Sequence, residues 1–97
     1  MIRIVAQYTV TAGAERAAQD TVRKFVRAVR SNEPATDYQV FRFADTLHFL
    51  HVMKFADETS HQKHRQAPHT LTLVEELYPL CDGEPIFTPL VAIDQVQ

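Results

Sequence analysis

Hydrophobic residues change their period several times along this chain, and the order of those periods constrains the fold most strongly. Residues 2–10 alternate: one side carries Ile2, Ile4, Ala6, Tyr8 and Val10. A period of two predicts a strand with one buried face. From about residue 14 to 30, apolar residues recur at three- and four-residue steps: Ala18, Val22, Phe25, Val26 and Val29. That spacing predicts an amphipathic helix, which should end before Pro34.

Strand patterns return after the first predicted helix. Two strands are predicted at 37–45 and 47–55, joined by little more than Asp45 and Thr46, as in a tight hairpin.

Two short helical pieces and a last strand follow the hairpin. Asp57 is suited to cap a helix that reaches about residue 66, and Pro68 interrupts that helix before a second piece at roughly 70–78. A final strand is predicted at 85–93, where Pro89 favours a sheet edge.

The resulting β-α-β-β-α-β order predicts an α+β fold. It is the ferredoxin-like arrangement, in which helices cover one face of an antiparallel four-stranded sheet, and residues 1–97 should form one such domain. Both faces of the predicted sheet carry apolar residues, for example Phe41 and Phe43 against Tyr38 and Val40. The chain has helices for only one face, so we expect a second copy of the chain to cover the other.

Composition excludes several classes of function. The formal net charge is −2, whereas a nucleic-acid-binding domain usually needs a basic surface. Four arginines share one face of the first predicted helix, which we interpret as a solvated face: Arg16, Arg23, Arg27 and Arg30. Cys81 is the only cysteine, so no disulfide forms within the chain. No segment resembles a signal peptide or a membrane span, and a cytoplasmic protein is the expectation.

Five histidines raise the question of a metal site, since four of them lie within residues 51–70. His48 and His51 are three apart on a predicted strand, so they project from opposite faces. His61 and His64 are three apart on a predicted helix and could contact one ion, but a third ligand is missing. With only two glycines there is also no dinucleotide-binding fingerprint. We therefore expect neither a metal nor another cofactor.

With this order of elements, the sequence resembles the antibiotic biosynthesis monooxygenase family of dimeric α+β barrels. The resemblance spans nearly the whole chain and rests on these pieces: Val10-x-x-Gly13-x-Glu15, Glu33-Pro34, Tyr38-x-Val40-x-Arg42, a strand ending at Phe55, a helix start at Asp57, and His64 followed by Pro68-His69. Muconolactone isomerase-like and stress-responsive barrel proteins share the fold.

The resemblance implies a homodimer whose sheets face each other, with a pocket between sheet and helices in each subunit. It also implies oxygenation of phenolic or hydroquinone-like substrates by dioxygen without metal or flavin. One branch degrades haem with the help of a tryptophan. This chain has no tryptophan, so that branch does not apply.

Such chemistry needs a base near neutral pKa, donors for an oxyanion and a pocket that excludes water. His64, which the family pattern repeats, is the candidate base, and Tyr38, His51 and Arg42 are candidate donors. A structural role for His64, hydrogen-bonded near Pro68, is the alternative. Aromatic and apolar residues could hold a flat ring: Phe25, Phe41, Phe49, Met53 and Tyr78. His61 and His69 lie among polar residues and are expected to be solvated.

Three hypotheses for function follow. The first is a cofactor-independent monooxygenase that acts on a small phenolic, quinol or polyketide-type aromatic substrate. The second is a non-oxidative isomerase on the same scaffold, and the third is a stress-related barrel dimer that binds a small molecule without turnover. Oxygen uptake distinguishes the first hypothesis from the other two.

Overall fold

Residues 1–94 are described by the computed structural model, and they adopt the predicted order of elements. The elements are β1 (Ile2–Thr9), α1 (Glu15–Asn32), β2 (Asp37–Arg42), β3 (His48–Phe55), α2 (Glu58–Gln66), α3 (Pro68–Leu77), a short 3₁₀ helix (Tyr78–Leu80) and β4 (Ile86–Leu90). The predicted domain of residues 1–97 extends three residues beyond the described part. None of the helices in residues 1–94 is long and apolar enough to cross a bilayer.

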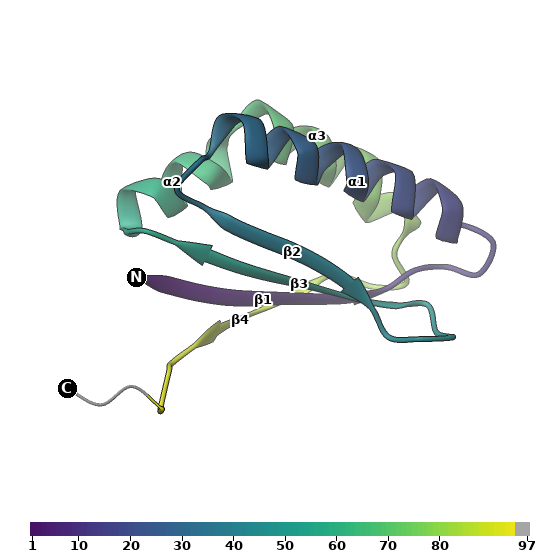
Figure 1. The fold of residues 1–97 in the computed structure, drawn as a ribbon. Coiled ribbons are helices and arrows are strands. Elements are labelled where there is room, and N and C mark those ends of the chain that lie inside the picture. Colours follow the sequence, from purple (N-terminus) through teal and green to yellow (C-terminus); the bar gives the residue numbers. More distant parts are fainter. Residues whose placement is uncertain (95–97) are drawn as a thin grey trace.

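The strands form one antiparallel sheet in the order β2-β3-β1-β4, and the helices pack on one face of it (Figure 1). This is the ferredoxin-like α+β fold, so the predicted fold class is confirmed. β1 and β3 are the central strands, and their register pairs Ala6 with His51 and Tyr8 with Phe49. Alternate side chains of the two central strands therefore lie on the same sheet face, the one that the helices cover.

The hairpin between β2 and β3 is wider than predicted. The strands end at Arg42 and begin at His48, because the Phe43 N–H donates to the His48 carbonyl (3.0 Å) and the Thr46 N–H donates to the Phe43 carbonyl (3.1 Å). Asp45 has a φ of 62°, in the left-handed region that aspartate tolerates better than most residues. The hairpin is present, but its loop is longer than the prediction of little more than Asp45 and Thr46.

Helix ends and the last strand follow the sequence signals closely. The Asp57 carboxylate accepts a hydrogen bond from the Ser60 N–H (2.8 Å) and caps α2 as predicted. α3 starts at Pro68, two residues earlier than predicted, because proline is well accommodated in the first helical turn, where its missing N–H needs no partner. β4 pairs only with β1, which confirms its edge position, although it is shorter than the predicted 85–93.

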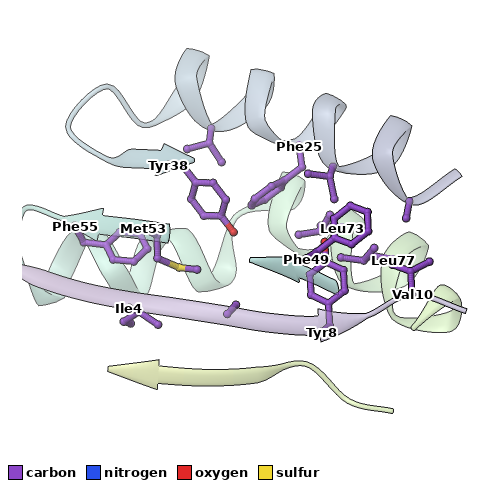
Figure 2. Packing of buried hydrophobic residues seen from close by; sticks show 14 residues of the cluster. Ile4, Tyr8, Val10, Phe25, Tyr38, Phe49, Met53, Phe55, Leu73 and Leu77 are labelled. Carbon is purple, nitrogen blue, oxygen red and sulfur yellow. The ribbon is translucent and has the colours of Figure 1, made fainter. Parts of the chain in front are cut away.

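The core lies between the helices and one face of the sheet (Figure 2). Its largest fully buried side chains are Phe55, Leu77, Val10 and Val29. The other face, which we call the outer sheet face, carries Val5, Phe41, Leu50, Val52 and Ile86. Phe41 is 51% exposed and Ile86 67% exposed. Both sheet faces therefore carry apolar side chains, as predicted, and the described residues leave the outer sheet face uncovered.

Truncation of Phe55 should destabilise the fold strongly. Phe55 is 0% exposed, and Phe→Ala changes in cores typically cost about 3–5 kcal/mol. Leu71 is 53% exposed on α3, so Leu71→Ala should cost less than about 1 kcal/mol. Urea unfolding of the two variants measures the difference, and equal losses would contradict this description of the core.

Candidate active site

A cavity of about 460 Å³ lies between the sheet and the helices. That volume is in the range of small-molecule sites, about 300–1,000 Å³. Its polar lining comes from Tyr8, Tyr38, His51, His61, His64, Arg65 and Thr70, and its apolar lining from Ile4, Ala6, Phe25, Met53, Leu73, Val74, Leu77, Tyr78, Pro85 and Phe87. The lining is therefore largely apolar, with polar groups contributed by β1, β2, β3, α2 and α3.

Glu33 joins two histidines, of which His64 lines this cavity. It follows the last turn of α1, where its N–H donates to the Val29 carbonyl (2.7 Å) and its own carbonyl accepts from the Thr36 N–H (3.0 Å). Its carboxylate receives hydrogen bonds from His64 Nδ1 (2.9 Å) and from His69 Nε2 (2.5 Å). The three side chains are only 12%, 7% and 13% exposed, in the order Glu33, His64, His69.

The shared carboxylate fixes the tautomer of His64. A carboxylate only accepts hydrogen bonds, and Glu33 is ionised: burial opposes ionisation, but hydrogen bonds from His69 and His64 outweigh it and hold the pKa of this carboxyl below its ordinary value. Burial lowers the pKa of His64, although Glu33 partly offsets the shift. His64 is therefore a neutral ring with its proton on Nδ1, and Nε2 keeps its lone pair.

A second set of polar side chains, one from each of three adjacent strands, lines the cavity. His51 lies between two phenols, with Tyr8 Oη 2.7 Å from Nε2 and Tyr38 Oη 2.7 Å from Nδ1. Burial lowers the pKa of His51 to about 4, and it raises the pKa of both tyrosines above the ordinary value. All three groups are uncharged at neutral pH.

Hydrogen-bond counting then assigns roles within this trio. A neutral imidazole has one N–H donor and one acceptor nitrogen. One tyrosine must therefore donate to His51, while the other accepts from it. The accepting tyrosine retains its own O–H proton for a group in the cavity.

The structure brings most of the predicted site residues to this cavity. The residues that line it are His64, His51, Tyr38, Phe25, Met53 and Tyr78. Three others lie elsewhere. Phe41 is on the outer sheet face, Phe49 is buried beside the cavity and stacks on Tyr8 (5.3 Å between ring centroids), and Arg42 is exposed over a separate hollow against α1.

His61 and His69 are not solvated as predicted. His61 lines the cavity, its side chain is 18% exposed, and its ring packs 4.8 Å from that of Phe55. His69 is bound to Glu33 and lies 5.8 Å from the ring of Phe25. Polar neighbours along the sequence were a poor guide, because His61 packs on Phe55 of β3 and His69 packs on Phe25 of α1.

Known proteins resemble this chain in sequence and in fold. The antibiotic biosynthesis monooxygenase family model matches residues 1–76. The chain belongs to this family. Membership supports a general monooxygenase-like role. A comparison with curated proteins gave no match.

Solved structures agree on the fold of this family member. A crystal structure of an antibiotic biosynthesis monooxygenase is 20% identical, with 96% of this chain and 99% of that chain covered and a TM-score of 0.88. A Mycobacterium tuberculosis protein is 16% identical over 99% of this chain and 98% of its own, with a TM-score of 0.87. A Methanosarcina mazei protein is 19% identical over 92% and 89%, with a TM-score of 0.85. At such identities the likeness shows the fold alone.

Tyr8, Glu33 and His69 are the site residues that the sequence analysis did not select. Glu33 and His69 were among the residues on which the family resemblance rested, which was the available signal for both. Tyr8 is on the buried side of the alternating first strand, and only the register of β1 against β3 places it beside His51.

The buried neutral His51 should make stability depend on pH. Its pKa is 6.5 as a free side chain and about 4 in the fold, so between these values the unfolded chain binds a proton that the folded chain does not. The contribution is complete above about pH 6.5 and is lost as the pH falls to 4, on the order of 3 kcal/mol. Unfolding free energies at pH 7 and 4.5 should fall more steeply in the parent than in His51→Gln, whose side chain does not titrate. Identical slopes would disprove the assignment.

Proposed function

We propose that this chain is a cofactor-independent monooxygenase of a small phenolic, quinol or polyketide-type aromatic substrate, with His64 as general base. The observation that carries the proposal is the 2.9 Å hydrogen bond between Nδ1 of His64, a cavity-lining residue, and Glu33, which leaves Nε2 as the nitrogen that can accept a proton. A carboxylate that orients an imidazole in this way also stabilises the imidazolium that forms when the base accepts a proton.

The first step is proton transfer. His64 Nε2 takes the hydroxyl proton of the substrate, and the resulting anion is electron-rich enough to reduce dioxygen, which reacts poorly with neutral closed-shell molecules. One electron passes to dioxygen, and the substrate radical and superoxide combine to form a carbon–oxygen bond. Proton return from His64 gives a hydroperoxide.

The second step releases water. Where the oxygenated carbon still carries hydrogen, loss of that proton breaks the O–O bond and leaves a carbonyl. The net change is CH₂ + O₂ → C=O + H₂O, in which the substrate provides all the electrons. No external reductant is needed.

Tyr8, Tyr38 and His51 support this chemistry as a neutral donor array. The tyrosine that accepts from His51 directs its O–H towards an oxyanion or a peroxide oxygen, and a donor fixed before reaction stabilises developing charge better than mobile water. Phe25, Met53 and other apolar lining residues hold the ring and exclude bulk water.

The proposed active unit is a homodimer. The uncovered outer sheet face carries Val5, Phe41, Leu50, Val52 and Ile86, and a monomeric protein seldom leaves such a contiguous apolar surface in water. A second copy that places its own outer sheet face here would form a self-complementary two-fold interface.

Loss of the base should abolish most turnover. General-base assistance is worth about 10²- to 10⁴-fold, so His64→Ala should reduce oxygen consumption with a hydroquinone or an anthrone by at least about a hundredfold. Glu33→Gln should lower it less, since the base remains but loses its orienting carboxylate. An oxygen electrode measures the rates.

The matched control is Lys63→Ala, one exposed residue earlier on α2, which should leave the rate unchanged. His61 is unsuitable as a silent control because it lines the cavity. Full activity of His64→Ala would remove it as the base. Product formation without oxygen uptake would favour the isomerase hypothesis, and binding without any product would favour the non-catalytic dimer.

The dimer should be disrupted by a charge on the outer sheet face. Val52, which lies on the central strand β3, points away from the helices, so Val52→Lys should convert a micromolar dimer into a folded monomer. Sedimentation velocity measures the mass, and circular dichroism checks the fold. Thr72→Lys, on the exposed side of α3, is the control and should remain dimeric. A folded monomeric parent would refute the dimer.

A further inference from the structure

Glu33, His64 and His69 form a ligand set that the sequence analysis did not find. Glu33 Oε2, His64 Nδ1 and His69 Nε2 belong to one carboxylate and two imidazoles, and among the described residues no pair of the set's ligand atoms is more than 4.8 Å apart. The sequence had suggested only the pair His61 and His64. In the structure His69 takes the place of His61, and the third ligand, Glu33, comes from the end of α1, 31 residues away from His64.

We infer that Glu33, His64 and His69 bind a divalent transition-metal cation, of which Zn²⁺ is the representative, and that this cation switches off the proposed base. Two imidazoles and a carboxylate suit zinc and other first-row cations. Three protein ligands also leave a further coordination position for water or a ligand.

The geometry needs little adjustment to accept an ion. Ligand atoms at about 2.0–2.2 Å from a tetrahedral ion lie about 3.3–3.6 Å apart. The two hydrogen-bonded separations are 2.9 and 2.5 Å, so the Glu33 side chain would move back by about 1 Å. The two imidazole nitrogens lie within 4.8 Å of each other and would approach by up to about 1.5 Å. The ion would replace the two protons that now lie between the carboxylate and the rings.

The surroundings already hold the ligands in place. The rings of His64 and His69 each lie 5.8 Å from the ring of Phe25, and Tyr38 stacks on His64 at 5.6 Å.

Coordination would change the chemistry of His64 through its tautomer. A neutral imidazole that binds a cation through Nδ1 carries its proton on Nε2. Nε2, the proposed base, then becomes a donor and cannot take a proton from the substrate. This inhibition rests on the proposed function, whereas the binding site itself does not.

Direct binding to untagged full-length protein tests the site. Titration calorimetry with Zn²⁺ should give one ion per chain, and Co²⁺ should give the visible absorption of a nitrogen–oxygen site. His69→Ala and Glu33→Gln should each weaken binding at least tenfold, while His61→Ala should not change it. Circular dichroism confirms that each variant is folded.

The outcomes separate the site from the proposed reaction. Absence of 1:1 binding, or loss of binding in His61→Ala with retention in His69→Ala, would overturn the site. If the parent consumes oxygen, Zn²⁺ should inhibit it at the concentration that saturates the site, and an unaffected rate would overturn the switch. If the parent consumes no oxygen with any phenol or quinol, the proposed function fails while the calorimetry still decides the cation site.

Discussion

The carboxylate of Glu33 is the contact on which the candidate site depends. It lies at the end of α1 and binds one histidine from α2 and one from α3, so a single half-buried group connects the three α-helices. A buried carboxylate without partners would be costly. Two imidazole donors resolve that cost, and in return the carboxylate fixes which nitrogen of His64 carries the proton.

The polar groups on the sheet side of the cavity remain neutral, and this follows from burial. His51 is 2% exposed and Tyr38 6% exposed, and no charged residue forms a hydrogen bond with either among the contacts of residues 1–94. The site therefore combines one charged network, which reaches the cavity through His64, with one uncharged network on the sheet. In the proposed reaction, a substrate anion formed beside His64 would meet neutral donors on the sheet, while the Glu33 carboxylate would stabilise the imidazolium.

The sequence predicted the elements well because their signals are local. Alternation in residues 2–10, the Asp57 cap and Pro89 at the edge strand all rest on neighbouring residues, and the described residues bear them out. The predicted loop length of the hairpin between β2 and β3 was wrong because the loop depends on the left-handed conformation of Asp45, which the composition of the turn did not specify.

Prediction of the site was less complete because its contacts are distant in the chain. Glu33 lies 31 and 36 residues from its histidines, and Tyr8 lies 43 residues from His51. Periodicity gave the face of each strand but not which residues meet across the sheet. The same limit explains why Phe41 and Phe49 were placed beside a ligand, although one points away from the helices and the other packs in the core.

The break between α2 and α3 has a geometric consequence for the two histidines of this site. In one continuous helix, residues five apart would point about 140° away from each other, since each residue turns the helix by 100°. His64 and His69 nevertheless converge on one carboxylate, because Ala67 is extended (φ −66°, ψ 144°) and Pro68 begins a new helix axis. A single non-helical residue thus changes the direction of the helix axis between the two histidines. Because of this change, two imidazoles five residues apart point at the same carboxylate, although a spacing of five matches neither helical nor strand periodicity.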